Sequence, residues 1–272
     1  MKPFFVLTIF FLSFSCLAWG QSSWFNDLEF GLSVAQKSGR LALVDFWATW
    51  CGPCKAMDRE VWDTPEATVF KQLFVPIKVN IDQERGVAAT YGVQAIPMIL
   101  IMDYTGKVLF SERGYSGREP LVKLLASIPN DVSAYYERLA QLESKATSAE
   151  LRDVGLALQL ISNRTTAGQL RNSLLAQSDI YLKKAKKSAD DSNMEIELTL
   201  WQSLNDAYRN RAGKAIKEIL ELSSSDLSPR NVALSYWVLS ECYKAAGDTG
   251  NQTKYLDLFR QHPASGDLKL AE

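Results

Sequence analysis

The chain has 272 residues, of which 47% are hydrophobic and 22% are charged, a composition typical of globular proteins. Its length exceeds that of one typical domain, so we expect two. The 30 basic and 31 acidic residues leave a formal net charge of −1, which excludes a general electrostatic attraction to nucleic acids or acidic membranes. We therefore expect no nucleic-acid partner.

Residues 1–20 have the pattern of a secretory signal peptide. Lys2 precedes an apolar run over residues 4–17, and a polar stretch follows Gly20. The run is shorter than the roughly 20 apolar residues of a membrane-spanning helix, so we expect cleavage after Gly20 and no stable membrane span. Export then leads to the periplasm in a cell with two membranes. Full secretion and lipid attachment at Cys16 stay open as alternatives.

Residues 21–129 predict one α/β domain. Short apolar runs of β type alternate with helix-forming segments, and the turn sequence at 103–106 predicts that the last two strands form a hairpin. The expected strands cover residues 41–45, 74–80, 98–102 and 107–111, and the expected helices begin at residue 52 and cover residues 84–91 and 119–127. This order predicts a central mixed sheet flanked by helices.

Two cysteines lie at the start of the first expected helix. After signal cleavage the chain keeps Cys51, Cys54 and Cys242, and this odd number does not suggest a disulfide framework. Because Gly52 and Pro53 open the helix, Cys51 precedes its first turn and Cys54 lies one turn further on. The helix N-terminus lowers the pKa of a thiol. We therefore expect Cys51 to attack disulfides and Cys54 to resolve the mixed disulfide, with no cofactor beyond this pair.

Other uses of a Cys-x-x-Cys pair fit the sequence less well. Zinc sites usually have four ligands, and the only histidine of the chain is His262. Haem attachment requires a histidine where Lys55 stands. We therefore predict no metal site. A purely structural disulfide between the two cysteines remains an alternative.

Residues 130–272 show only helical periodicity. Thr147 with Glu150, and Thr166 with Gln169, have the spacing of capping boxes at helix starts. No strand-like alternation interrupts this half of the chain. We therefore predict an all-α second domain.

A repeat occurs within this helical half. Three positions recur with an offset of 35 residues, so that Trp201, Leu204 and Tyr208 are followed by Tyr236, Leu239 and Tyr243. Gly213 and Gly247 are expected at the turns of the two copies. The second copy resembles a tetratricopeptide repeat, which is a pair of antiparallel helices of about 34 residues. Cys242 lies on an apolar helix face of this copy, and we expect it to be buried and inert.

The segment around the cysteine pair resembles the active site of thioredoxins. Residues 44–55 read Val-Asp-Phe-Trp-Ala-Thr-Trp-Cys-Gly-Pro-Cys-Lys, and residues 95–97 read Ala-Ile-Pro, like the cis-proline loop of that family. Residues 78–82 and 91–93 match further stretches of it in the same order. The resemblance covers residues 41–128 and implies a thioredoxin fold with disulfide-exchange activity.

The resemblance also implies roles for single residues. Asp45 would be the buried carboxylate that accepts a proton while Cys54 is activated, and Lys78 would be its charged neighbour. Because such a carboxylate is desolvated, we expect its pKa to be raised. Protein clients would contact a surface around the sulfurs, formed by Trp50, Gly52, Pro53, Ile96 and the cis residue Pro97.

One segment departs from thioredoxins. Arg59 stands where they commonly have a proline, and residues 57–61 look more like the thioredoxin-like domains of exported thiol-disulfide interchange proteins. We therefore predict an exported oxidoreductase that exchanges disulfides with protein clients, with the reductase or isomerase direction favoured by the Gly-Pro dipeptide. Such a protein requires a partner redox protein that supplies or removes electrons. The alternative is a helical-repeat scaffold that uses the thioredoxin unit mainly for recognition.

Overall fold

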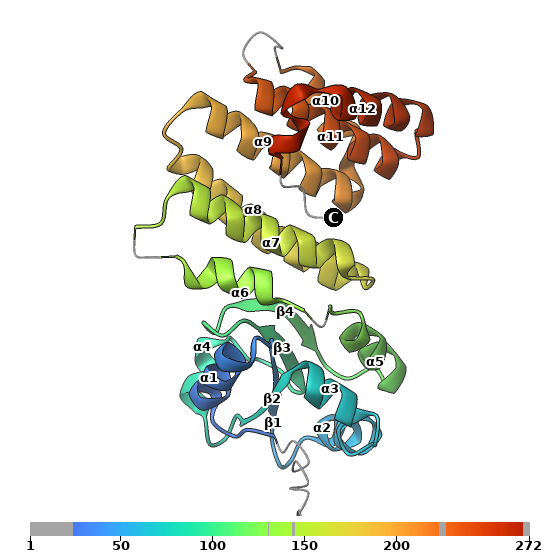
Figure 1. Ribbon diagram of the computed structural model, residues 1–272. Helices are drawn as coiled ribbons and strands as arrows, with labels where there is room; N and C mark the ends of the chain where they lie inside the picture. Colours follow the sequence, from blue (N-terminus) through green and yellow to red (C-terminus); the bar gives the residue numbers. More distant parts are fainter. Residues whose placement is uncertain (1–23, 130, 143–144, 223–226, 269–272) are drawn as a thin grey trace, which may run out of the picture.

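The computed structural model describes residues 24–129, 131–142, 145–222 and 227–268. The expected signal peptide and Cys16 lie outside these residues. The described chain forms an α/β unit at one end of the molecule and a stack of helices that extends away from it (Figure 1). This arrangement confirms the predicted order of an α/β fold followed by an all-α half.

The α/β unit is built on a four-stranded mixed sheet with the strand order β2-β1-β3-β4. Strand β1 runs parallel to β2 and antiparallel to β3, and β3 pairs antiparallel with β4. The strands are β1 (Ala42–Trp47), β2 (Val75–Asn80), β3 (Met98–Met102) and β4 (Val108–Arg113). Every residue of β3 is buried, and β1 is buried up to its last residue, because helices cover both faces of the sheet.

Helices flank this sheet on both sides. They are α1 (Leu28–Ser38), α2 (Gly52–Met57), α3 (Ala67–Leu73), α4 (Arg85–Thr90) and α5 (Arg118–Ala126), with a π-helical turn over Asp58–Trp62 after α2. Helix α1 was not among the predicted elements, although Asp27 caps its start and Gly39 ends it in the left-handed conformation. Gly31 lets α1 approach β2 closely, because a Cβ atom there would overlap the Ile77 side chain.

The second half is helical throughout its described residues. Its helices are α6 (Ser133–Ala140), α7 (Ser148–Arg164), α8 (Gly168–Lys187), α9 (Ser192–Asp206), α10 (Ala212–Leu220), α11 (Pro229–Ala246) and α12 (Thr249–Gln261), followed by a 3-10 turn over Pro263–Asp267. The capping box of Thr147 and Glu150 is confirmed. The one predicted for Thr166 and Gln169 is wrong, because α8 begins after Ala167 and no side chain caps it.

The hairpin turns of the two repeat copies are made by different residues. Gly247 ends α11 with a φ of 77°, as predicted. Gly213 instead lies inside α10, and the left-handed residue between α9 and α10 is Asn210, with a φ of 62°. Asparagine tolerates this conformation better than most residues, so it replaces the expected glycine.

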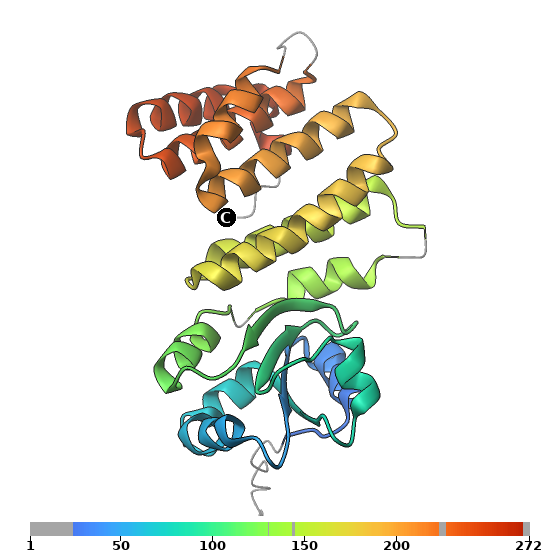
Figure 2. The ribbon, with the colours of Figure 1, turned by 180° about the vertical axis from the view of Figure 1, so that it is seen from behind.

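The hydrophobic core continues across the junction between the two halves. One cluster of buried side chains contains Leu109 of β4, Leu125 of α5, Tyr135 of α6, Leu158 of α7 and Leu174 of α8. Figure 2 shows α6, α7 and α8 stacked between the sheet and the remaining helices. Helices α6–α8 therefore complete the core of the α/β unit. The domain boundary expected near residue 130 stays a prediction.

Hydrogen bonds add specificity to this junction. Asp103, at the end of β3, is fully buried and accepts a hydrogen bond of 2.6 Å from the Tyr135 hydroxyl of α6. The Ser173 hydroxyl of α8 donates to the carbonyl of Leu109 on β4, also at 2.6 Å. These bonds satisfy polar groups that would otherwise be buried unpaired, so they fix how the helices dock.

Replacing Tyr135 with phenylalanine tests this junction. We expect Tyr135→Phe to lower the free energy of unfolding by about 1–3 kcal/mol, because the buried acid loses a donor while the ring is kept. Urea denaturation measures this loss. Tyr136→Phe is the matched control, since that hydroxyl donates at 2.9 Å to the neutral backbone carbonyl of Arg40. An equal or larger loss in the control would contradict the special role of Asp103.

Candidate active site

The turn between β1 and α2 places the cysteine pair. Strand β1 ends at Trp47, the Cys51 amide donates to the Ala48 carbonyl at 3.1 Å, and Cys51 is then the N-cap of α2. The Cys54 amide donates to the Cys51 sulfur at 3.1 Å. The predicted position of Cys51, ahead of a helix whose first turn holds Pro53, is confirmed.

Cys51 and Cys54 are joined by a disulfide, with a Cα–Cα distance of 5.3 Å. Their exposed fractions are only 3% and 1%. Ala48, Trp47, Ile81 and Ile96 pack around the pair. The protein is therefore described in its oxidised form, with the sulfurs almost covered by apolar side chains.

The residues predicted to contact clients lie around this disulfide. Gly52 and Pro53 are exposed beside the buried cysteines, and Ile96 packs against them. The Ile96-Pro97 peptide bond is cis, as the resemblance implied. Trp50 is 66% exposed, and its indole N–H donates to Asp82 at 2.9 Å. The dithiol thus has an exposed rim that is mostly apolar.

Asp45 lies in the middle of β1, away from solvent. One of its carboxylate oxygens accepts a hydrogen bond of 3.2 Å from the Trp62 indole and lies 3.9 Å from the Lys78 ammonium. Its other oxygen has no hydrogen-bond partner among the described residues. The resemblance implied that Lys78 is the charged neighbour of Asp45, and the two residues are paired across β1 and β2.

Asp58 is a further acid at this site that the sequence analysis missed. Lys78 makes its close ion pair with Asp58, not with Asp45. Asp58 follows Cys54 by four residues, which is the spacing of one helix face, and this signal could have drawn attention to it. Lys78 is therefore shared between two carboxylates.

Aromatic rings hold Lys78 in place. Its ammonium lies 5.3 Å from the ring centroid of Trp24 and 5.4 Å from that of Trp47, distances at which a cation is attracted to the ring. Trp24 also meets Trp62 edge to face at 5.1 Å. The segment before α1 therefore takes part in the site, which no sequence pattern indicated.

The pKa of Asp45 is raised to about 7, and burial is the largest cause. The negative charge of Asp58 contributes to this rise, whereas the charge of Lys78 and the hydrogen bond from Trp62 oppose it. The expected direction is confirmed, and burial is its main cause. Asp45 can therefore exchange a proton near neutral pH.

The third cysteine among the described residues lies far from this chemistry. Cys242 on α11 is fully buried, and burial raises the pKa of its thiol to about 12. Its predicted burial is confirmed. A thiol with so high a pKa forms little thiolate and is a poor nucleophile.

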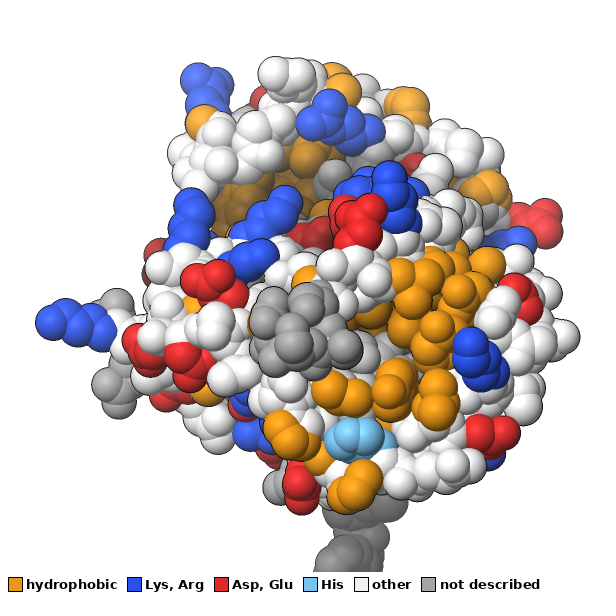
Figure 3. All heavy atoms as spheres, turned by 90° about the horizontal axis from the view of Figure 1, so that it is seen from above, with side chains coloured by type: hydrophobic (Ala, Val, Ile, Leu, Met, Phe, Trp, Pro, Cys, Tyr) orange, Lys and Arg blue, Asp and Glu red, His pale blue; other side chains and the backbone are white. Residues whose placement is uncertain are grey.

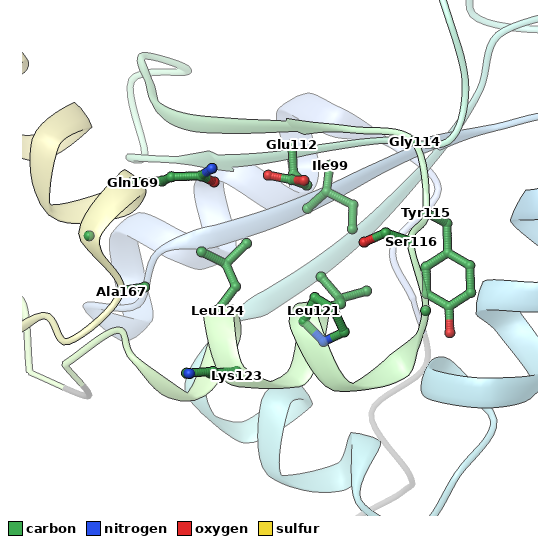
Figure 4. A pocket seen from close by; sticks show the side chains of 13 residues that line it. Ile99, Glu112, Gly114, Tyr115, Ser116, Leu121, Lys123, Leu124, Ala167 and Gln169 are labelled. Carbon is green, nitrogen blue, oxygen red and sulfur yellow. The ribbon is translucent and has the colours of Figure 1, made fainter.

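A cavity of about 300 Å³ lies beside the α/β unit, between α5, β3 and the start of α8. Figure 4 shows Ile99, Leu121 and Leu124 pointing into it, with Ala167 and Gln169 on its far side. None of the predicted site residues lines it. The cavity is therefore separate from the dithiol.

The described part of the chain contains no group of three or more His, Cys, Asp or Glu side chains that could hold a metal ion. None of its helices is long and apolar enough to cross a membrane.

Comparison with known proteins identifies the family of the α/β unit. Residues 22–128 match the family model named thioredoxin. The thioredoxin of Bacillus subtilis is 34% identical over 91 residues, which cover 34% of this chain and 85% of that protein. The chain belongs to the thioredoxin family. Thioredoxin 2 of Chlorobaculum tepidum, also 34% identical, matches over 88 residues, or 32% of this chain and 78% of that protein.

Two solved structures are also similar to part of this chain. A thioredoxin from Nicotiana alata is 30% identical, with a TM-score of 0.31, over 36% of this chain and 82% of that one. The C-terminal domain of DsbD from Neisseria meningitidis in its oxidised form is 18% identical, with a TM-score of 0.33, over 37% of this chain and 95% of that one. Membership of the thioredoxin family, together with the Cys51-Cys54 pair, makes the protein a thiol-disulfide oxidoreductase.

Substituting Asp58 tests the shared lysine. We expect Asp58→Asn to lower the pKa of Asp45 from its value of about 7, because a nearby negative charge is removed and Lys78 is free to pair with Asp45 alone. The pH dependence of the Asp45 carboxyl carbon shift, followed by NMR on the oxidised protein, measures this change.

Glu60→Gln is the control for that experiment. It removes the same charge from the same helical segment, but Glu60 is exposed and bonds Tyr115 instead of Lys78. The Asp45 titration should not move in this variant. An unchanged titration in Asp58→Asn, or an equal shift in Glu60→Gln, would rule out the role assigned to Asp58.

Proposed function

We propose that the protein is an exported oxidoreductase that exchanges disulfides with protein clients through Cys51 and Cys54. The observation that carries this proposal is the cysteine pair at the N-terminus of α2, with the cis Ile96-Pro97 bond in the neighbouring loop. The direction that we favour is reduction or isomerisation of client disulfides.

The first step is attack by Cys51. In the reduced protein, the free amides at the start of α2 stabilise its thiolate. The thiolate attacks one sulfur of a client disulfide, an S–S bond forms between client and enzyme, and the other client sulfur leaves as a thiolate that takes a proton.

The second step releases the client. Cys54 loses its proton, attacks the Cys51 sulfur and forms the Cys51-Cys54 disulfide, so that the client leaves as a dithiol and has gained two electrons. Asp45, with a pKa of about 7, is the base that we assign to this proton. Lys78 stabilises the carboxylate form of Asp45, which lowers the pKa of Asp45 and so keeps this group able to accept a proton near neutral pH.

Client recognition takes place on the rim of the site. Because the sulfurs are nearly covered, a client must lie across the exposed surface of Trp50, Gly52 and Pro53 to reach them. The backbone of Ile96, next to Pro97, is the edge with which an extended client segment would pair. Asp82 holds the Trp50 ring in place through its hydrogen bond.

The catalytic cycle needs a partner. Each reduced client leaves the enzyme oxidised, so a second redox protein must return two electrons to Cys51 and Cys54. We place the protein in the periplasm, because residues 1–20 have the pattern of a signal peptide; secretion or lipid attachment at Cys16 would keep it outside the cytoplasm as well.

The helical half has a different task in this proposal. Helices α9–α12 lie at the opposite end of the molecule from α2, as both ribbon views show (Figures 1 and 2). In this proposal they bind protein clients or the redox partner, and their position leaves the dithiol uncovered. The scaffold alternative assigns the whole protein to such binding, but it gives no reason for a cysteine pair at a helix N-terminus beside a carboxyl group of raised pKa.

Cysteine variants test the proposed activity, with insulin and dithiothreitol as the probe. Cys51→Ser should abolish insulin reduction, because the attacking sulfur is lost. Cys54→Ser should accumulate covalent adducts with client proteins that thiol reagents release, because the mixed disulfide is no longer resolved.

The matched control is Cys242→Ala. It removes the buried third cysteine and should leave the rate of insulin reduction unchanged. Normal turnover in Cys51→Ser would exclude the proposed mechanism. Partners that bind equally well when both Cys51 and Cys54 are replaced, with no adducts in Cys54→Ser, would instead favour the scaffold alternative.

A further inference from the structure

The two oxygens of the Asp45 carboxylate have different surroundings. The first, Oδ2, accepts a hydrogen bond of 3.2 Å from the Trp62 indole and lies 3.9 Å from the Lys78 ammonium. The second, Oδ1, is buried and has no hydrogen-bond partner among the described residues. Because buried polar atoms are usually hydrogen-bonded, this difference between the two oxygens needs an explanation.

Trp62 is fixed beside Asp45 by the core of the α/β unit. Its side chain is 2% exposed and belongs to the buried cluster that also contains Leu43 of β1 and Ile99 of β3. Trp24 packs edge to face on its ring, with the centroids 5.1 Å apart. The indole N–H therefore has a fixed direction, and it points at Oδ2.

The π-helical turn after α2 brings two different groups to the same pair of residues. The Asp63 amide donates to the Asp58 carbonyl at 2.8 Å, and this bond spans five residues, as π-helical bonds do. The first residue of the turn, Asp58, pairs with Lys78, and the last, Trp62, bonds Asp45. Such turns are frequent at functional sites.

An indole nitrogen donates one hydrogen bond and accepts none. Trp62 can therefore bond Oδ2 in both protonation states of Asp45, but it can never take the proton itself. The ammonium of Lys78 is engaged with Asp58, and Ile99, which is paired with Asp45 on β3, is apolar. Oδ1 is thus left as the oxygen on which a proton can settle.

We propose that Trp62 is the positioning residue of the proton acceptor, because its N–H holds Oδ2 of Asp45 and leaves Oδ1 to receive the proton of Cys54. The inference rests on the proposed function, in which Asp45 is the base of the second step. The Cys54 thiol gives its proton to Oδ1, its thiolate attacks the Cys51 sulfur, and the bond between Cys51 and the client breaks. The proton then passes from Oδ1 to the client thiolate that leaves, which returns Asp45 to its charged form.

The same hydrogen bond keeps Asp45 a base near neutral pH. Burial and the charge of Asp58 raise its pKa, while the charge of Lys78 and the bond from Trp62 hold the pKa at about 7. Without the indole donor, the charged carboxylate loses its one hydrogen bond within the described structure, so its pKa should rise further. A smaller fraction of Asp45 would then be in the base form at neutral pH.

Trp62→Phe tests this role, since it keeps an aromatic ring and removes the donor. The pKa of Asp45, followed through its carboxyl carbon shift by NMR on the oxidised protein, should rise by about one pH unit. Insulin reduction relative to the wild type should fall about fivefold near pH 7 and recover almost fully near pH 9. A loss caused by damaged packing would persist at every pH.

A second variant separates the donor from the shape of the side chain. The amino acid β-(3-benzothienyl)alanine, introduced at position 62, has the two-ring shape of tryptophan with sulfur in place of the N–H. It should reproduce both changes expected for Trp62→Phe. It also keeps the test open if the smaller phenylalanine ring prevents folding.

Trp201→Phe is the matched control. Trp201 is 6% exposed, and its indole also donates to a carboxylate, that of Glu197, at 3.4 Å. Its helix, α9, belongs to the helical end of the molecule, which Figure 3 views from above and which lies opposite α2 (Figure 1). Neither the Asp45 titration nor the pH dependence of relative insulin reduction should change in this variant.

Three results would overturn the role assigned to Trp62. They are an Asp45 titration that does not move upward in either variant at position 62, an equal shift in Trp201→Phe, and a loss of insulin reduction that is the same at every pH. The NMR titration needs no client. A wild type that reduces no insulin would therefore contradict the proposed function, whereas normal reduction with an unmoved titration would overturn the role of Trp62 alone.

Discussion

The burial of β1 at the centre of the sheet is the constraint on which the site depends. With β2 on one edge and β3 on the other, the strand removes Asp45 from water and raises its pKa to about 7. The same strand then leads through a short turn to Cys51 at the start of α2. One buried strand therefore positions both the proton acceptor, Asp45, and the cysteine pair. Because the two sulfurs are nearly covered, a client can reach them only across the exposed residues around them.

Much of this site could be predicted because its signals are local. The strand pattern, the cysteine spacing, Pro53 in the first turn and the place of Asp45 all follow from neighbouring residues. Asp58 and Trp62 could not be assigned in this way, since their contacts with Lys78 and Asp45 depend on how the segment after α2 packs against the sheet. Asn210 was not predicted as the turn residue before α10, because the expectation of a glycine at such a turn points to Gly213.

The two halves of the chain are less independent than their sequence patterns indicated. A change from strand alternation to helical periodicity marks where one architecture ends, but it says nothing about which helices bury the sheet. Tyr135 and Leu174 lie in the helical half and belong to the core of the α/β unit. The helices beyond α8 form a second core of their own, which contains Leu204 and Leu239.

The burial of Cys242 also limits the number of disulfides that the described part of the chain can form within itself. A protein with three reactive thiols could form three different internal disulfides, and each would form by the loss of two electrons but join a different pair of residues. Because the third sulfur is enclosed among apolar side chains of α11 and its neighbours, it cannot compete for Cys51 or Cys54. The cysteines of the described residues thereby have one oxidised and one reduced state, so they can carry electrons in pairs without forming alternative disulfides.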